Sequence, residues 1–166
     1  MVKAMEYTKE QIQQRWKESV KRQDALEAEY RKAHGLTLSV SVSTPEIIAE
    51  EVEQNRLFHE YKEAYRRDEK EYKECCRSMA AKMGADEIKQ ALEEIQRLHS
   101  ACIRRRDAYV AEYKRTHYIP SRCRIVTPEI IEEEEFQRRL FIEFYALYSR
   151  LKEQSEVQSR AGEVFR

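Results

Sequence analysis

The chain has 166 residues, with 31 Lys+Arg balanced by 31 Asp+Glu, and only three Gly and three Pro. Charged residues make up 37% of the chain, and this composition, rich in helix formers and poor in helix breakers, predicts long helices and argues against a disordered chain. The zero net charge removes the general electrostatic reason to expect binding to nucleic acid or to an anionic membrane surface.

The sequence carries no targeting or membrane signal that we can identify. Residues 1–10 hold no apolar run of the kind found in a secretory signal, and no stretch approaches the length of a membrane-spanning helix. The cysteines, Cys75, Cys76, Cys102 and Cys123, form no CxxC motif and are expected to be reduced thiols. We therefore expect an intracellular protein, cytoplasmic or cytoskeletal in the first instance, with a mitochondrial location as the alternative.

An internal duplication organises the chain. Residues 24–67 align with residues 107–150 without a gap, at a constant offset of 83, and His34 matches His117. The longest identical motif opens a helix in each copy: Thr44, Pro45, Glu46, Ile47 and Ile48 match Thr127, Pro128, Glu129, Ile130 and Ile131. Shared composition does not produce a motif of this kind, so the sequence predicts one structural unit used twice.

Each copy is expected to form a helix, a loop and a second helix. Thr8 and Gln11 form a capping-box pattern that opens the first helix, which runs to about His34 and can end at Gly35. Segment 36–43 alternates apolar and hydroxyl side chains, a period of two that predicts an extended, half-buried connection. Behind it, a Thr cap, a Pro at the first helical position and an acid beside the positive helix end start the second helix.

The long helices show apolar stripes at helical spacing. In the second helix of the first copy we expect a seam formed by Phe58, Tyr61, Tyr65, Tyr72, Cys75 and Met79, and in the second copy one formed by Phe141, Phe144, Tyr148 and Leu151. In the third helix, which Asp86 is expected to cap, we expect a stripe formed by Ile88, Leu92, Ile95, Leu98, Cys102, Tyr109 and Tyr113.

These elements predict an all-α fold of two duplicated long αα-hairpins in an elongated four-helix antiparallel arrangement, packed as one bundle or end to end. The expected boundaries are residues 1–84 for the first hairpin repeat, 85–157 for the second, and 158–166 for a frayed C-terminal tail.

Catalytic motifs are missing from the sequence. The glycines stand alone, so no phosphate-binding loop is present, and none of the four histidines follows a Glu at the spacing of a di-iron motif. We therefore expect no enzymatic activity, no cofactor, no metal and no small-molecule substrate. For His34 and His117, capping of the last helix carbonyls is favoured over a ligand or pH-sensing role.

Partner contacts are expected from basic and aromatic side chains. Arg104, Arg105 and Arg106 could bind a phosphate or an acidic tail, although structural salt bridges are favoured for them. Ten Tyr and five Phe exceed what thin hairpins can bury, so exposed aromatic side chains, Tyr118 and Tyr145 among them, are expected to contact partners.

The sequence favours a non-enzymatic helical structural subunit that binds into a larger protein assembly. Two concrete forms are a cytoskeletal or axonemal (microtubule-associated) lattice and a mitochondrial complex. The alternative is an adaptor or binding module that recognises a peptide or nucleic acid through the groove between the hairpins; of these two ligands, nucleic acid is the less favoured.

Overall fold

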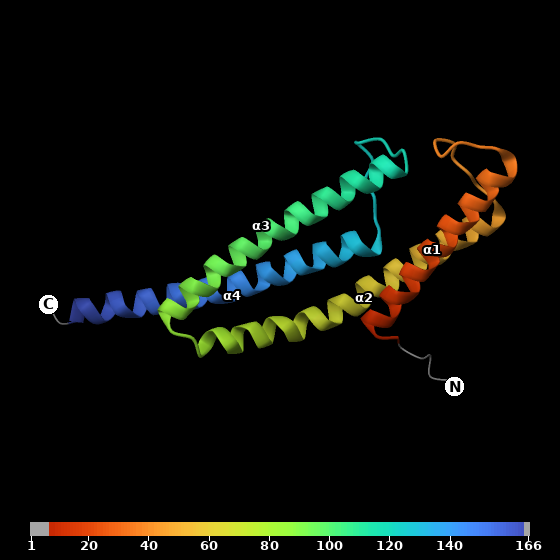
Figure 1. Cartoon of the computed structure of the whole chain (residues 1–166). Coiled ribbons are helices and arrows are strands. Elements are labelled where there is room, and N and C mark those ends of the chain that lie inside the picture. The colour runs from red at the N-terminus through yellow and green to blue at the C-terminus, as the bar shows by residue number, and fades with distance from the viewer. Residues whose placement is uncertain (1–6, 165–166) are drawn as a thin grey trace, which may run out of the picture. The chain divides into compact units, whose positions relative to one another are not determined.

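A computed structural model describes the backbone of residues 7–164 and the side chains of residues 7–157. It contains α1 (Lys9–His34), α2 (Pro45–Ala81), α3 (Ala85–Thr116) and α4 (Pro128–Val164), with no strand in the described residues (Figure 1). Helix α1 packs on α2 and α3 packs on α4, which confirms the prediction of an all-α fold built from helix pairs. None of the described helices is both long enough and apolar enough to cross a membrane.

The contacts divide the chain into two compact units. Unit 1 contains α1, α2 as far as Asp68 and residues 111–128, and unit 2 contains α2 from Glu69, α3 as far as Val110 and α4 from Glu129. Because α2 and α3 each run through both units, the units do not coincide with the repeats, and the repeat boundaries after residues 84 and 157 stay a prediction. Most of segment 158–166, where we expected a frayed tail, is helical backbone up to Val164, and residues 165–166 lie outside the described residues.

The helix starts follow from local sequence, with one correction. The Thr8 hydroxyl accepts from the Gln11 N–H at 3.3 Å, and the Gln11 side chain accepts from the Thr8 N–H at 2.9 Å, so the predicted capping box is present. Helices α2 and α4 begin at the two motif prolines, as predicted. At α3 the prediction of Asp86 as the cap is wrong. The Glu87 carboxylate instead accepts from the Gly84 N–H at 2.9 Å, because an acid at the third helical position can reach back to the residue that precedes the helix.

The helix ends repeat even where the residue changes. Gly35 has φ 60°, in the left-handed region, and its equivalent in the second copy, Tyr118, has φ 54°. In both copies the following residue donates its N–H back into the helix at 2.9 Å, Leu36 to the carbonyl of Arg31 and Ile119 to that of Lys114. The second copy therefore keeps the turn of the first although glycine has been replaced by tyrosine.

The loop after α1 differs from its expected form. It contains a turn in which the Val40 N–H donates to the Thr37 carbonyl at 3.1 Å. Of its alternating apolar side chains, only Val42 is buried, whereas Leu36, Leu38 and Val40 are exposed. The prediction of a half-buried segment is wrong because a period of two buries one face only where a sheet neighbour covers it, and no strand is present in the described residues.

The core of unit 1 forms around the single tryptophan of the chain. The ring of Trp16 on α1 lies 5.6 Å from that of Phe58 and 6.4 Å from that of Tyr61, both on α2. Fully or almost fully buried side chains complete this core: Ile12, Ile47, Leu57, Tyr61 and Ala64. This burial explains why α1 and the first part of α2 pair.

The core of unit 2 joins three helices. Ala80 of α2, Ile88 and Ile95 of α3, and Leu140 and Leu147 of α4 form one buried cluster. The stripe that we predicted for α3 is confirmed as far as Cys102, since Ile88, Ile95 and Cys102 are buried and Leu92 and Leu98 pack against the cluster, whereas Tyr109 and Tyr113 are half-buried.

The predicted seams of α2 and α4 are partly wrong, by one residue. Towards the end of α2, Cys76 and Ala80 are buried, and the predicted Cys75 and Met79 are exposed. On α4, Leu140 and Leu147 are buried, and the predicted Phe141 and Tyr148 are exposed. The helical period places the neighbouring stripe only about 100° away, and the larger aromatic side chains suggested the wrong one.

Candidate interaction site

A carboxylate near the start of each motif helix makes the same interhelical contact in both copies. Glu50 accepts from the Ser19 hydroxyl at 2.6 Å and from Arg22 Nε at 2.8 Å. Glu133, 83 residues later, accepts from the Cys102 thiol at 2.8 Å and from Arg105 Nε at 2.9 Å. The duplication read from the sequence therefore extends to a pair of equivalent side-chain contacts.

These contacts are structural in their chemistry. The hydrogen bond from Arg22 is the main cause that lowers the pKa of Glu50, and the bond from Arg105 does the same for Glu133. Burial, followed by the Glu133 carboxylate, raises the pKa of the Cys102 thiol to about 11. At neutral pH the carboxylates are charged and the thiol is protonated, so Cys102 is not an activated nucleophile.

The basic triplet is mostly engaged within the chain. Arg105 binds Glu133, and Arg106 Nη2 lies 2.9 Å from the Asp107 carboxylate. The exposed Arg104 makes no ion pair within residues 7–157. Two of the three arginines therefore form the salt bridges that we favoured, and only Arg104 is left for a partner.

The two repeated histidines lie at equivalent helix ends. Nδ1 of His34 lies 2.9 Å from the Tyr30 carbonyl, and Nδ1 of His117 lies 3.0 Å from the Tyr113 carbonyl. Each imidazole also stacks on the tyrosine ring, with centroids 4.0 Å and 3.9 Å apart. This geometry agrees with capping of the last turn, and no group of three or more His, Cys, Asp or Glu side chains in the described residues is arranged to hold a metal ion.

Helix α4 carries a set of exposed aromatic side chains. Phe141 is 56% exposed and Tyr145 is 55% exposed, and their rings meet edge to face at 4.6 Å. The equivalent of Phe141 in the first copy is Phe58, which Trp16 covers, but the equivalent of Trp16 in the second copy is His99. The second copy thus exposes an aromatic position that the first copy covers. Tyr118, the other predicted contact, is exposed in the loop after α3.

Phe141 and Tyr145 line a groove of about 620 Å³ in unit 2. The part of the lining contributed by α2 consists of Lys73, Arg77, Ala80 and Ala81, and the part contributed by α4 consists of Arg138, Phe141, Ile142, Tyr145, Ala146, Ser149, Arg150 and Glu153. The helical period places Phe141, Tyr145 and Ser149 on a different side of α4 from Leu140 and Leu147, which face the core. Basic side chains border an apolar and aromatic floor.

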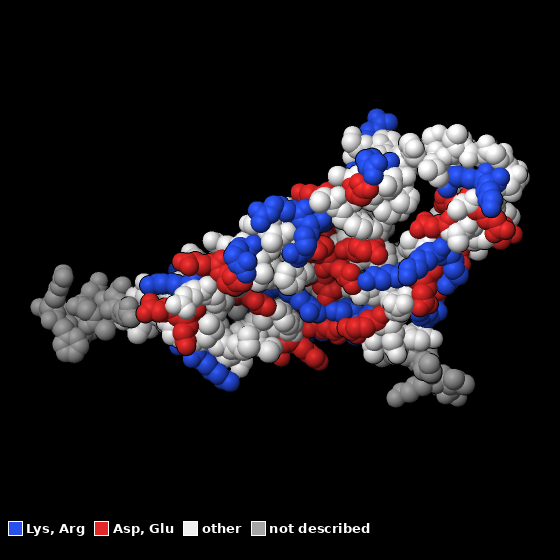
Figure 2. Space-filling view, in the orientation of Figure 1, with Lys and Arg blue, Asp and Glu red and all other residues white. Residues whose placement is uncertain are grey.

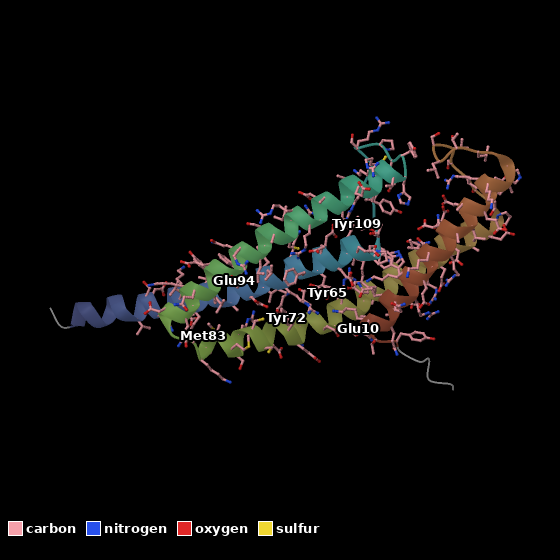
Figure 3. All side chains as sticks on the ribbon, viewed as in Figure 1. Glu10, Tyr65, Tyr72, Met83, Glu94 and Tyr109 are labelled. Carbon is pink, nitrogen blue, oxygen red and sulfur yellow. The ribbon has the colours of Figure 1, made fainter. Side chains whose placement is uncertain are left out.

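Contacts beneath the groove fix α2 against α4. Glu69 of α2 accepts from Arg138 Nε of α4 at 2.6 Å and contacts Lys73 Nζ at 2.5 Å. Arg138, and then Lys73, lower the pKa of Glu69 to about 2. Tyr72, which Figure 3 shows on the part of α2 beside α4, donates its hydroxyl to Glu143. Burial and then Glu143 raise the pKa of Tyr72, so the phenol keeps its proton at neutral pH.

Reasoning from the sequence found only part of this groove. Tyr145 was predicted as a partner contact and lines it, but Phe141 was assigned to the buried seam. The cations Lys73, Arg77 and Arg138 were not singled out, because charges of both signs are interspersed along the chain, as Figure 2 also shows for the surface. The available signal was the spacing of residues 138, 141, 145 and 149, which marks one stripe of a helix.

The groove combines apolar and aromatic side chains with charged ones. The titratable groups next to it are hydrogen-bonded to one another, Glu69 to Arg138 and Tyr72 to Glu143. Comparison of the chain with protein-family models, with curated proteins and with solved structures finds no match.

Proposed function

We propose that this chain is a non-catalytic helical subunit of a larger protein assembly and that it contacts its partner through the groove of unit 2. The observation that carries the proposal is the exposure of Phe141 and Tyr145 in a concave site. Aromatic side chains in partly enclosed apolar sites are enriched among the residues that dominate binding between proteins.

Further features support an interaction subunit. The long helices offer an extended surface for contact, and the zero net charge gives no general attraction to nucleic acid or to an anionic membrane. The duplication also presents the loop and the helix start of each hairpin twice. A partner that itself repeats would suit such a chain. A cytoskeletal or axonemal lattice is the first concrete form of this intracellular role, and a mitochondrial complex is the second.

The alternative is an adaptor that binds a short peptide, and the same apolar and basic lining of the groove supports it. Recognition of nucleic acid has less support, because Arg105 and Arg106 are already engaged by acidic side chains.

Site-specific photo-crosslinking in the native cell tests the proposal. A benzophenone amino acid replaces Tyr145 in the full chain, and a matched control places it at Val52, an exposed position on α2 in unit 1. We expect the Tyr145 variant to give a recurrent adduct with one or a few proteins that the Val52 variant does not give. The absence of any adduct at Tyr145, or the same proteins at both positions, would contradict the proposal.

A further inference from the structure

We infer that the groove between α2 and α4 binds an acidic amphipathic α-helix of a partner protein. This inference rests on the proposed function and specifies the chemistry of the partner.

The groove is bordered by two helices, α2 and α4, between which a third helix can pack. On α4 the lining residues Arg138, Phe141, Tyr145 and Ser149 follow one stripe over about 17 Å, or three turns. On α2, Lys73 and Arg77 stand one turn apart on the facing border. Two helices that border a groove present ridges against which a third helix can pack, as in helix-in-groove recognition.

The floor is suited to the apolar face of such a helix. The small side chains Ala81 and Ala146 leave room for close approach, while Ala80 and Ile142 line the groove as buried residues of the core. Phe141 and Tyr145 rise from α4 with more than half of each side chain in solvent. A docked helix would remove both aromatic rings from water, which is the main favourable contribution to binding of this kind.

The border specifies the charge of the partner. The groove is lined by four cations, Lys73, Arg77, Arg138 and Arg150, and by one acid, Glu153. Glu69 pairs with Arg138 and Lys73, and even when it is counted with Glu153 the four cations exceed the acids by two, so the border keeps an excess of positive charge.

Two of these cations have unused donors. Arg77 is exposed and has no ion pair within residues 7–157. Arg150 approaches Glu153 with Nη1 at 3.5 Å, while its buried Nε has no hydrogen-bond partner among the described residues. A carboxylate on an incoming helix would pair with the exposed guanidinium of Arg77.

A second copy of this chain fits the border less well. The most acidic run of the chain, residues 132–135, is partly engaged within α4 and α3, since Glu133 binds Arg105 and Glu135 binds Arg139. The complementary charge is therefore expected on a different protein.

Fluorescence anisotropy with the full chain and three labelled helical peptides tests the inference. The first peptide has Leu and Phe on one face and Glu on the other, the second replaces each Glu by Lys, and the third scrambles the first. We expect the first peptide to bind at least about tenfold more tightly than the other two, with an affinity that falls as salt rises. Equal binding of the acidic and basic peptides, or of the ordered and scrambled ones, would overturn the inference.

Variants locate the binding. Arg77→Glu and Phe141→Ala should each weaken the acidic peptide by about tenfold while the far-UV circular dichroism stays unchanged, because both side chains are exposed. Arg97→Glu is the matched control, since Arg97 is exposed on α3 and, among the side chains of residues 7–157, pairs only with Glu94 of its own helix. Binding that ignores Arg77→Glu and Phe141→Ala, or that falls equally with Arg97→Glu, would place the peptide elsewhere and overturn the inference.

The outcomes separate this inference from the proposed function. A partner crosslinked at Tyr145 together with no binding of the acidic peptide sinks the acidic-helix assignment and leaves the interaction subunit standing. Binding of the acidic peptide with no crosslink at Tyr145 in the cell contradicts the proposed function and leaves the acidic-helix assignment standing. Dimers in size-exclusion chromatography that Arg77→Glu dissociates would show that a second copy occupies the groove, and this result would also overturn the inference.

Discussion

Glu69→Gln is the substitution that best tests how α2 is held against α4. The Glu69 carboxylate is 11% exposed and bridges Arg138 of α4 and Lys73 of its own helix. Glutamine keeps the size of the side chain but loses the negative charge, so two cations that line the groove lose their shared counter-charge.

The magnitude follows from the pKa of Glu69 and from the exposure of its partners. The fall of the Glu69 pKa from its ordinary value of 4.5 to about 2 sets a ceiling of about 3.4 kcal/mol on the contribution of the charged form. Arg138 is 56% exposed and Lys73 is also largely in water, so solvent screens much of this interaction. We expect Glu69→Gln to lower the free energy of unfolding by about 1–2 kcal/mol at pH 7.

The pH dependence of the effect has a defined sign. Because the pKa of Glu69 is lower in the folded chain, its contribution is fully present above about pH 4.5 and is lost as the pH falls towards 2. The difference in stability between the parent chain and the variant should therefore shrink to about 40% of its neutral value at pH 3.

Urea denaturation at fixed ionic strength measures this difference. Far-UV circular dichroism reports on all helices, and the fluorescence of Trp16, the single tryptophan, reports on unit 1. The loss should appear in the helical signal more than in the tryptophan signal. The control Glu94→Gln, which removes an exposed pair within α3, should change stability much less. An unchanged midpoint for Glu69→Gln at pH 7, or a difference that is the same at pH 3, would refute this reasoning.

Three further predictions concern the repeat and the thiols. Cys102→Ser should change the free energy of unfolding by less than about 1 kcal/mol, because in the first copy the Ser19 hydroxyl makes the same contact to Glu50. Cys102→Val should lower the urea midpoint, because Glu133 then loses a hydrogen-bond donor. In a thiol-reagent assay on single-cysteine chains, Cys75 should react much faster than its neighbour Cys76, because Cys75 is exposed while Cys76 is buried with a raised pKa; equal rates would mean that α2 is turned differently. Gly35→Ala should cost about 1 kcal/mol in chemical denaturation, although no atom crowds the added Cβ, because φ is 60° there; no loss would indicate that the loop adopts another backbone conformation.

Local chemistry made the helix ends predictable. The Thr8 and Gln11 capping box, Gly35 at the end of α1, and the Thr-Pro starts of α2 and α4 each involve residues within a few positions of one another. The duplication was equally accessible, because an ungapped offset needs no knowledge of packing.

What the sequence could not predict depends on helices that meet in space. The groove requires the end of α2 to lie beside α4, and the contact that holds it, between Glu69 and Arg138, joins residues 69 positions apart. The choice between neighbouring stripes, Phe141 or Leu140 towards the core, depends on which side α3 occupies. The sequence favours structural salt bridges for Arg104 to Arg106, but which of the three find a partner depends on the packing: Arg105 pairs with Glu133 and Arg106 with Asp107.

Footprinting of the aromatic side chains tests the central claim most directly, which is that the groove of unit 2 is open in the free chain and covered in its assembly. Hydroxyl-radical labelling of Phe141 and Tyr145 would be compared between the purified chain and the assembly isolated from its native cell, with exposed Val52 as an internal reference in unit 1. We predict strong labelling of Phe141 and Tyr145 in the free chain and marked protection of both in the assembly. Equal labelling in the two samples, while other parts of the chain become protected, would contradict the account.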